Sequence, residues 1–246
     1  MTQTVLVTGA AAGLGNVIAT SLLKQGYQVV LTDVDATRAR EAAARLDDGQ
    51  DRVLALGLDI CQPQDFADAL DATITRFGSL DVLVNNAALT LATPVMEIAV
   101  EEFDRVIATN LRGTFVGCQT MGRYFATRGY GRIINLASLA GQNGGTASGA
   151  HYAASKGGIL TLTKIFAREL SKSGVTVNAI APGPLDLPMV HALVPEEKMP
   201  GLLQTIPVGQ LGEAEFVAQA VALLASEQAS FVTGATWDIN GGLFMR

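Results

Sequence analysis

The stretch that decides the fold is Thr8-Gly9-Ala10-Ala11-Ala12-Gly13-Leu14-Gly15. A short β-branched run, 4–8, leads into it, and an amphipathic helical pattern, 14–24, follows it. Glycines let a strand turn tightly into a helix, whose first N–H groups can then bind a pyrophosphate. The spacing TGxxxGxG is one residue longer than the GxGxxG dinucleotide fingerprint. The stretch predicts a strand–turn–helix unit that binds a dinucleotide through Gly9, Ala12, Gly13, Leu14 and Gly15.

The same alternation continues along the chain. Strands are predicted at 28–33, 52–57, 82–85, 131–136, 176–180 and 236–238, and helices at 36–46, 63–77, 101–126, 151–171 and 213–225. Uninterrupted apolar strands that alternate with helices indicate a parallel sheet buried on both faces. We therefore expect an α/β fold: one Rossmann-like domain over 1–246, with a doubly wound parallel sheet of about seven strands and helices on both faces.

One segment breaks the pattern. Residues 182–207 hold six of the eight prolines and show no clear periodicity. A long irregular segment inside a compact domain is usually functional, although it can also be an ordered surface excursion. We predict a substrate lid at about 184–208.

Composition excludes several classes of protein. The chain has 246 residues, 49% of them hydrophobic and 16% charged, with a net charge of −6. An acidic chain without a basic run argues against nucleic acid or an anionic membrane as partner. Cys61 and Cys118 lack metal-site spacing, so we expect no metal and a reducing compartment. No apolar run is long enough to span a membrane, and no basic residue precedes Lys24, so we expect a cytoplasmic protein.

Asp33 bears on the choice of dinucleotide. It ends the second predicted strand, and a carboxylate there can accept both adenosine ribose hydroxyls and repel a 2′-phosphate. Ala12 stands where a basic residue before Gly13 would favour a phosphate. Both features favour NAD over NADP, while the nearby Arg38 and Arg40 keep NADP open.

Three side chains predict proton chemistry at the other end of the site. Tyr152 and Lys156 share one helix face, because they are four residues apart. A nearby ammonium is expected to lower the phenol pKa from about 10 towards the working range. Ser138 follows the fifth predicted strand, at the sheet edge where ligands bind, and its hydroxyl can donate to a carbonyl oxygen. No nucleophile–histidine–acid set is evident, which disfavours serine hydrolysis.

Taken in order, these motifs resemble the short-chain dehydrogenase/reductase family. The resemblance runs from Val5 to Gly242 and rests on TGxxxGxG, on NNAA at 85–88, on Ser138, on YxxxK at 152–156 and on Pro182-Gly183. Each motif alone is weak, but the full set in this order and at these separations is specific.

The resemblance implies a role for each matched residue. Tyr152 would be the general acid/base, Lys156 would tune its pKa and bind the nicotinamide ribose, and Ser138 would position the substrate oxygen. Asn110 would hold a water in a proton relay to the lysine. Further cofactor contacts are implied for Asp59 and Ile60 at the adenine, Asn86 and Ala87 after the fourth strand, and Pro182 and Gly183 beside the nicotinamide.

The chain departs from the family pattern at two places. Ala88 replaces the glycine of NNAG, and Leu187 stands where a threonine often bonds the nicotinamide carboxamide. Leucine cannot make that bond, so the anchor must come from backbone, including that of Leu185, or be weaker. The resemblance also implies a homotetramer, with the helices at 101–126 and 151–171 in one interface and the C-terminal tail and strand in another.

The expected substrate face lies between the glycine-rich loop 138–151 and the lid. It is mostly apolar and holds no arginine, which favours a neutral secondary alcohol or ketone. His151 beside Tyr152 could be a second acid/base or a substrate contact, but we favour a pocket-rim or packing histidine. Asn85 is expected to bond backbone between strands.

Three functions remain open. The leading one is an NAD-dependent oxidoreductase that interconverts a secondary alcohol and a ketone. The alternative is a 3-oxoacyl-thioester reductase acting on a carrier-protein or CoA thioester, an enzyme type that usually uses NADPH. The third is a non-catalytic NAD-binding regulatory module, which the presence of Asn110, Ser138, Tyr152 and Lys156 disfavours.

Overall fold

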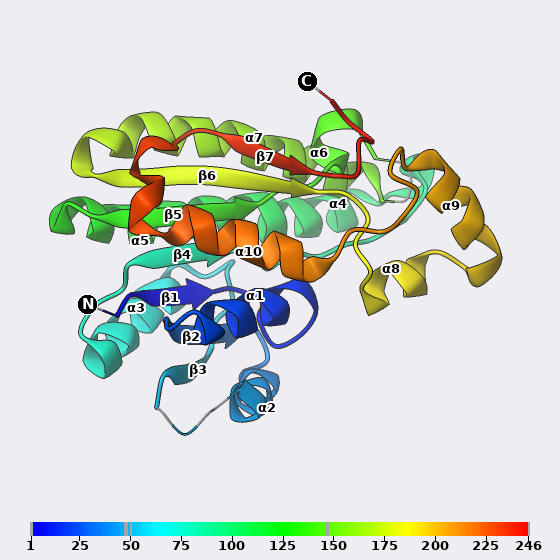
Figure 1. Ribbon diagram of the computed structural model, residues 1–246. Coiled ribbons are helices and arrows are strands. Elements are labelled where there is room, and N and C mark those ends of the chain that lie inside the picture. The colour runs from blue at the N-terminus through cyan, green and yellow to red at the C-terminus, as the bar shows by residue number, and fades with distance from the viewer. Residues whose placement is uncertain (1, 47–48, 50, 146–147, 246) are drawn as a thin grey trace.

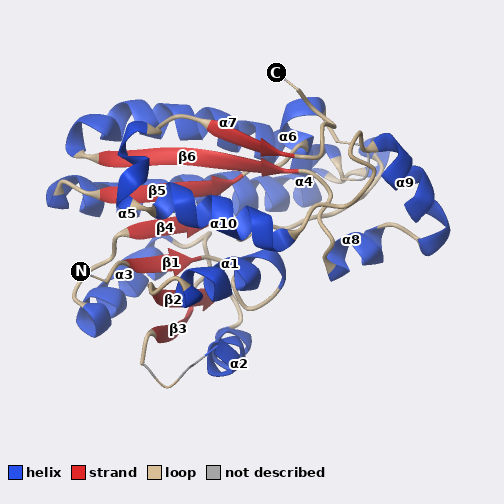
Figure 2. Ribbon diagram, viewed as in Figure 1, coloured by secondary structure: helices blue, strands red, loops and turns tan. Residues whose placement is uncertain are grey.

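The computed structural model describes residues 2–46, 49, 51–145 and 148–245, so Thr146 and Ala147 of the glycine-rich loop lie outside the described residues. Seven parallel strands form one sheet in the order β3-β2-β1-β4-β5-β6-β7 (Figures 1 and 2). The strands are β1 (Thr4–Val7), β2 (Gln28–Asp33), β3 (Val53–Gly57), β4 (Val82–Asn85), β5 (Gly131–Leu136), β6 (Val175–Pro182) and β7 (Thr236–Ile239). The predicted single-domain, Rossmann-like, doubly wound sheet is confirmed.

Helices cover both faces of this sheet. One face carries α1 (Gly13–Lys24), α2 (Ala36–Leu46) and α10 (Ala214–Ala225), and the other carries α3 (Pro63–Phe77), α5 (Gly113–Arg128) and α7 (Ala150–Leu170). Figure 1 shows α1 and α10 side by side in front of the strands. Among the described helices, none combines the length and the apolar character needed to cross a bilayer.

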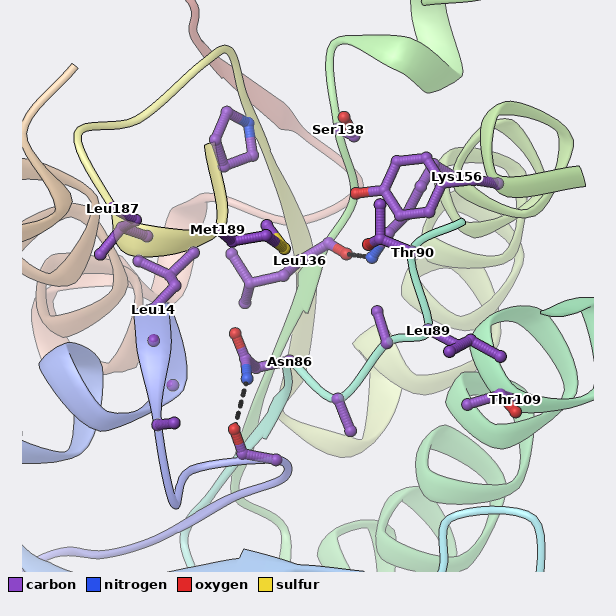
Figure 3. Close-up of a pocket in the computed structure, with 18 of the residues that line it drawn as sticks. Leu14, Asn86, Leu89, Thr90, Thr109, Leu136, Ser138, Lys156, Leu187 and Met189 are labelled. Carbon is purple, nitrogen blue, oxygen red and sulfur yellow. Dashed lines mark hydrogen bonds between the residues drawn. The ribbon is translucent and has the colours of Figure 1, made fainter. Parts of the chain in front are cut away.

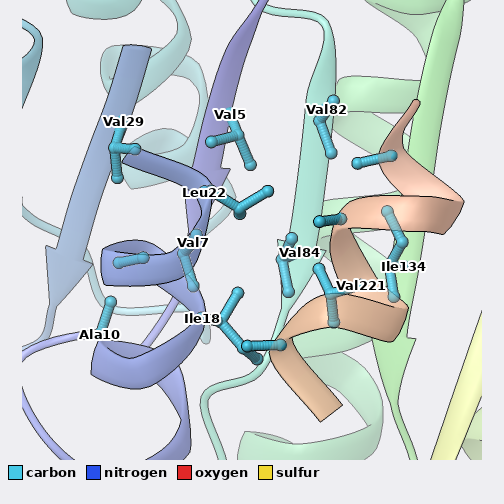
Figure 4. Packing of buried hydrophobic residues seen from close by; sticks show 14 of the residues in the cluster. Val5, Val7, Ala10, Ile18, Leu22, Val29, Val82, Val84, Ile134 and Val221 are labelled. Atoms are coloured by element: carbon cyan, nitrogen blue, oxygen red, sulfur yellow. The ribbon is translucent and has the colours of Figure 1, made fainter. Parts of the chain in front are cut away.

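Alternation along β1 explains the continuous apolar strands. Val5 and Val7 pack against α1 and α10, whereas Leu6 points to the opposite core. Figure 4 shows Val5 and Val7 of β1 facing Ile18 and Leu22 of α1. Because both faces are buried, Val5, Leu6 and Val7 are all apolar, and the sequence shows a run instead of an alternation.

The helix predicted at 101–126 is interrupted. It consists of α4 (Val100–Ile107), a π-helical turn η2 (Ala108–Arg112) and α5. A π turn takes in one extra residue and shifts the face that follows, and such turns often occur at functional sites. Asn110 lies in this turn and is completely buried. Hydrophobic periodicity cannot reveal a single wide turn, which is why the sequence predicted one regular helix.

The segment 184–208 is more regular than predicted. It contains α8 (Pro188–Leu193), the 3₁₀ turn η4 (Glu196–Lys198) and α9 (Met199–Thr205). Proline is well tolerated in the first turn of a helix, and Pro188 and Pro200 lie in the first turns of α8 and α9. Figure 1 shows α8 and α9 beyond the carboxyl ends of the strands.

The remaining elements are short. They are α6 (Ala140–Asn143), in the glycine-rich loop predicted at 138–151, and the 3₁₀ turns η1 (Val95–Glu97), η3 (Ser171–Ser173) and η5 (Glu227–Phe231).

Candidate active site

One cavity of about 770 Å³ lies at the carboxyl edge of the sheet. Its walls come from the glycine turn after β1, the ends of β2 to β6, and α8 (Figure 3). The structure brings the following predicted residues to it: Gly9, Ala12, Gly13, Leu14, Gly15, Asp33, Asp59, Ile60, Asn86, Ala87, Ser138, Tyr152, Lys156, Pro182, Gly183 and Leu185. Asn110 is not part of its lining.

The glycine turn leaves no room for side chains at two places. A Cβ on Gly15 would lie 2.4 Å from Asn86 Nδ2 and 2.5 Å from the Gly9 carbonyl oxygen. Gly9 has φ +63°, and its Cβ would lie 2.8 Å from Ala87 Cα. The turn therefore packs directly against the chain that follows β4, and its main chain lines the cavity.

Hydrogen bonds hold these two segments together. Asn86 Nδ2 donates to the carbonyl oxygens of Thr8 (2.9 Å) and Gly9 (3.1 Å). Figure 3 shows the side-chain nitrogen of Asn86 pointing towards the glycine turn. In return, Thr8 Oγ1 accepts from the N–H groups of Asn86 (3.0 Å) and Ala87 (3.1 Å). Thr8 is a residue whose role the sequence did not predict, since its partners are far away in the chain.

Two carboxylates line the half of the cavity near this turn. Asp33 Oδ1 accepts from the Asp35 N–H at 3.2 Å, and Asp59 Oδ1 accepts from the Cys61 N–H at 2.9 Å. Arg38 and Arg40, which kept NADP open, are not among the residues that line the cavity.

Lys156 is buried, with 3% of its surface exposed. Its Nζ donates to the Leu136 carbonyl oxygen at 2.6 Å, a bond visible in Figure 3. Nζ also lies 5.6 Å from the centre of the Tyr152 ring. Burial penalises the ammonium and lowers the pKa of Lys156 to about 8.

The pKa of Tyr152 is shifted in the direction opposite to the one that the sequence predicted. Burial raises the pKa of its phenol above the usual value, and hydrogen bonding with Ser138 and Thr90 offsets only part of this. The expected lowering is not found, because the desolvation of the phenol outweighs the other influences on its pKa. Thr90 is a second functional candidate that the sequence analysis missed.

Asn110 lies behind the cavity. Its Oδ1 accepts from the Leu89 N–H (2.7 Å), and its Nδ2 donates to the Leu89 carbonyl oxygen (3.0 Å) and to Ser155 Oγ (3.1 Å). Thr114 Oγ1 donates to the Asn110 carbonyl oxygen at 2.7 Å. The side chain thus holds the segment after β4 against α7. A part in a proton relay stays a prediction.

Asn85 bonds a side chain and not, as expected, the backbone of a neighbouring strand. Its Nδ2 donates to Asn135 Oδ1 on β5 at 2.9 Å. Asn135 Nδ2 donates in turn to Thr163 Oγ1 on α7 at 3.0 Å. Cys118 lies beside this pair, and burial raises the pKa of its thiol to about 12, so it is no thiolate at neutral pH.

His151 is completely buried and does not line the cavity, so the packing interpretation is the one that the structure supports. Its Nδ1 accepts from the Tyr152 N–H at 2.8 Å, and its Nε2 lies 2.9 Å from Glu102 Oε1. Within the described ranges, no group of three or more histidine, cysteine, aspartate or glutamate side chains is arranged to hold a metal ion.

The segment 184–208 contributes apolar side chains to the other half of the cavity. Leu187, Pro188, Met189 and Val190 line it. The Leu185 carbonyl oxygen accepts from the Leu187 N–H at 2.9 Å. The site as a whole is a cleft with main-chain groups and two carboxylates at one end, and the hydroxyls of Thr90, Ser138 and Tyr152 beside a buried lysine at the other.

Comparisons with known proteins identify the family. A solved structure described as a short chain dehydrogenase from Bacillus anthracis superposes with a TM-score of 0.89 at 30% identity, covering 99% of this chain and 97% of that one. The chain belongs to the short-chain dehydrogenase/reductase family. The family model described as Enoyl-(Acyl carrier protein) reductase matches residues 9–244 of this dehydrogenase/reductase.

Curated relatives are similar over nearly the whole chain. A Vibrio cholerae protein named 3-oxoacyl-[acyl-carrier-protein] reductase FabG is 38% identical, covering 98% of this chain and 96% of its own length. A Staphylococcus aureus protein of the same name is 39% identical, covering 100% and 99%. These names support an oxidoreductase.

Proposed function

We propose that this short-chain dehydrogenase/reductase interconverts a secondary alcohol and a ketone with NAD(H). The observation that carries the proposal is one cavity that joins a glycine turn and Asp33 to the hydroxyls of Ser138 and Tyr152. At Gly9 and Gly15 a Cβ would collide with neighbouring protein atoms, so glycine preserves the turn whose main chain lines the cavity, where the proposal places the pyrophosphate. NAD(H), when bound, supplies or accepts the hydride.

The side chains of the chain itself handle the proton. Tyr152 Oη donates a proton to the substrate oxygen in reduction and accepts it in oxidation. Ser138 Oγ donates a hydrogen bond to the same oxygen and orients it. Lys156 stands close enough to stabilise the phenolate form of Tyr152, and a pKa of about 8 lets it carry charge at neutral pH. The Thr90 side chain also hydrogen-bonds Tyr152.

The NAD preference rests on Asp33. Its carboxylate would repel a 2′-phosphate, so Asp33→Asn should raise the ratio of kcat/KM for NADP to that for NAD by about tenfold or more. Asp35→Asn is the matched control: it removes the same charge two residues away, at a side chain that does not line the cavity. Equal ratios in the two variants would contradict the assignment of Asp33.

The substrate class has a second candidate. The names of the relatives favour a 3-oxoacyl thioester over a small free alcohol or ketone. Reduction of such a thioester at its 3-oxo group is the same ketone chemistry, and the apolar side chains of α8 suit an acyl chain. Of the described residues that line the cavity, Arg105 and Lys156 are the only cations, so the site offers little to a phosphate-bearing carrier.

One assay separates these candidates. NAD and NADP are tested in parallel against secondary alcohols, ketones, and 3-oxoacyl thioesters of CoA and of a carrier protein, with Tyr152→Phe as control. NAD-linked turnover of a free alcohol or ketone supports the leading proposal, and turnover of thioesters alone selects the second candidate. Retained NAD binding without any turnover would favour a non-catalytic regulatory module instead.

Assembly as a cytoplasmic homotetramer is also part of the proposal. Several large apolar side chains are exposed near η1 and on α4, α5 and α7, namely Val95, Met96, Val100, Phe103, Phe115 and Ile165. Exposed apolar patches of this kind support burial against a second copy. The molar mass from light scattering tests it, and a monomer at micromolar concentration would contradict it.

A further inference from the structure

The first turn of α7 has an unusual cap. Gly149 is the N-cap residue and has no side chain, and Tyr152 is the third helical residue, so helix geometry leaves the Tyr152 N–H without a partner inside the helix. His151 Nδ1 accepts from that N–H at 2.8 Å. The imidazole thus accepts a hydrogen bond from a free N–H of the first turn, as the side chain of a serine, threonine or aspartate at the N-cap usually does.

This bond decides which nitrogen of His151 carries the proton. Because Nδ1 accepts from a main-chain N–H, its lone pair is occupied, and the ring proton lies on Nε2. Nε2 then donates to Glu102 Oε1, 2.9 Å away on α4. Thr93 and His151 both hydrogen-bond the Glu102 carboxylate and lower its pKa, and Arg105 adds to this, so the carboxylate stays ionised as the acceptor.

The ring has no freedom to turn away. His151 has no exposed surface, and a Cβ on Gly149 would lie 2.3 Å from its Cε1. The Gly149 N–H donates to the Leu91 carbonyl oxygen at 2.8 Å. Three segments therefore meet at this imidazole: the chain after β4, α4 and the start of α7.

We propose that His151 is a positioning residue for Tyr152 and that Glu102 sets the orientation of its ring. Tyr152 lies in the first turn of α7, which depends on this cap, whereas Lys156 lies one turn later and is fixed separately through Leu136. Losing the cap moves the phenol relative to Ser138 and Lys156 while the cofactor end stays intact. This inference rests on the proposed function, since His151 acts only through Tyr152.

Two substitutions separate the two hydrogen bonds of the ring. The amide oxygen of asparagine can occupy the place of Nδ1, so H151N keeps an acceptor for the Tyr152 N–H but no longer reaches Glu102. The amide of glutamine reaches the place of Nε2 but has no acceptor at the δ position. We expect H151Q to lower kcat by about tenfold or more, with KM for NAD(H) within about twofold, and H151N to keep kcat within about threefold.

Glu102 provides a second pair of variants, which leaves the sequence of α7 unchanged. E102Q keeps an oxygen that can accept from Nε2–H, whereas E102A removes the acceptor. We expect kcat of E102Q to stay within about twofold of the wild type and kcat of E102A to fall by more than this twofold range. This pair carries the kinetic test if H151Q fails to fold. Equal kcat in E102Q and E102A would overturn the part assigned to Glu102.

A spectroscopic test needs no activity. The sequence contains two histidines, His151 and His191, so ¹⁵N NMR with H191N as assignment variant isolates the His151 ring. At neutral pH we expect Nδ1 unprotonated and Nε2 protonated. A protonated Nδ1 would overturn the inference, whatever the kinetics.

The outcomes for His151 and for the proposed function are distinct. If the wild type turns over and Tyr152→Phe does not, yet H151Q matches the wild type or H151N falls as far as H151Q, the positioning role is wrong and the proposed function stands. If the wild type is inactive on the whole panel, or Tyr152→Phe is as active as the wild type, the proposed function fails and the positioning role fails with it.

Discussion

The two ends of the cavity are built from different material. At the dinucleotide end the surface is main chain: Gly9 and Gly15 leave no room for a Cβ, and Asn86 holds the turn in place through carbonyl oxygens. At the catalytic end the surface is side chain, with a half-buried Tyr152 and a buried Lys156 near Ser138. The first end depends on shape and the second on protonation, so a substitution should fail for a steric reason at one and for an electrostatic reason at the other.

The contrast extends to how each end responds to burial. A main-chain turn loses little when it is buried, because its polar groups find partners in neighbouring segments. The ionisable groups at the catalytic end are charged only against the cost of desolvation, which raises the pKa of Tyr152 and lowers that of Lys156. Proton transfer needs groups whose pKa can be shifted, so the desolvation cost falls at the end of the cavity where the chemistry occurs.

The largest expected effect isolates the catalytic end. Tyr152→Phe removes the proton donor and should lower kcat by about 10²- to 10⁴-fold, while the Kd of NAD stays within about twofold because the dinucleotide end is unchanged. Steady-state kinetics and a fluorescence titration of NAD measure the two quantities. A loss of NAD binding equal to the loss of kcat would mean that the two ends are not separable.

The next effect concerns the stability of the catalytic end. The pKa of Lys156 falls from 10.5 to about 8 on folding, so the unfolded chain binds more protons between these values and stability rises with pH across that interval. At pH 7 the buried ammonium costs about 3 kcal/mol.

Lys156→Met removes that cost. Relative to the variant, the wild type should therefore gain about 2 kcal/mol of unfolding free energy when the pH is raised from 7 to 9.5. Urea denaturation at both pH values measures it, with Lys172→Met, at an exposed lysine, as control for the lost charge. A shift no larger than that of the control would show that Lys156 is not desolvated.

A smaller effect, of about 1–3 kcal/mol, is expected from overpacking at the dinucleotide end. Gly15→Ala should lower the unfolding free energy by that amount and weaken NAD binding by tenfold or more, because its Cβ would collide with Asn86 Nδ2 and the Gly9 carbonyl oxygen. Gly201→Ala on α9, where a Cβ meets nothing within 4 Å, is the control. Equal stability in both variants would argue against a steric origin.

The smallest effect tests the junction between the two ends. Leu187→Thr introduces the hydroxyl that the family often uses at the nicotinamide, and Leu187→Val has the same shape without it. Since a hydrogen bond contributes about 0.5–1.5 kcal/mol, the Kd of NAD should be about two- to tenfold lower in the threonine variant than in the valine variant. Equal values would mean that the backbone near Leu185 already anchors that end of the cofactor.

Local pattern was enough to predict much of the fold. Strands Gln28–Asp33, Val82–Asn85 and Gly131–Leu136 and helices Ala36–Leu46 and Pro63–Phe77 match the predicted bounds, because apolar runs and glycine or proline boundaries mark them. The short helices α6, α8 and α9 were missed. Helices of four to seven residues gain little from propensity and depend on tertiary contacts.

The residues of the site likewise fall into those that local motifs predict and those that depend on tertiary contacts. The predicted cofactor and catalytic residues line the cavity, apart from Asn110, because their motifs stand at strand ends that a parallel sheet brings to one edge. The substrate face predicted along the loop 138–151 is wrong for most of that loop, since only Ser138 of its described residues lines the cavity. Thr8, Thr90 and the His151–Glu102 pair stayed hidden, because their partners lie in other segments: His151 and Glu102 are 49 residues apart.

By itself, then, the sequence determined the sheet, the glycine turn, the carboxylate of Asp33 and the pairing of Tyr152 with Lys156 on one helix. Each of these follows from residues close together in the chain, where spacing and residue type carry the information. Only the tertiary structure decided the direction of the Tyr152 pKa, the partners of Asn110 and the cap that holds the start of α7. Those properties arise from burial and hydrogen bonds between distant segments, and no local pattern encodes them.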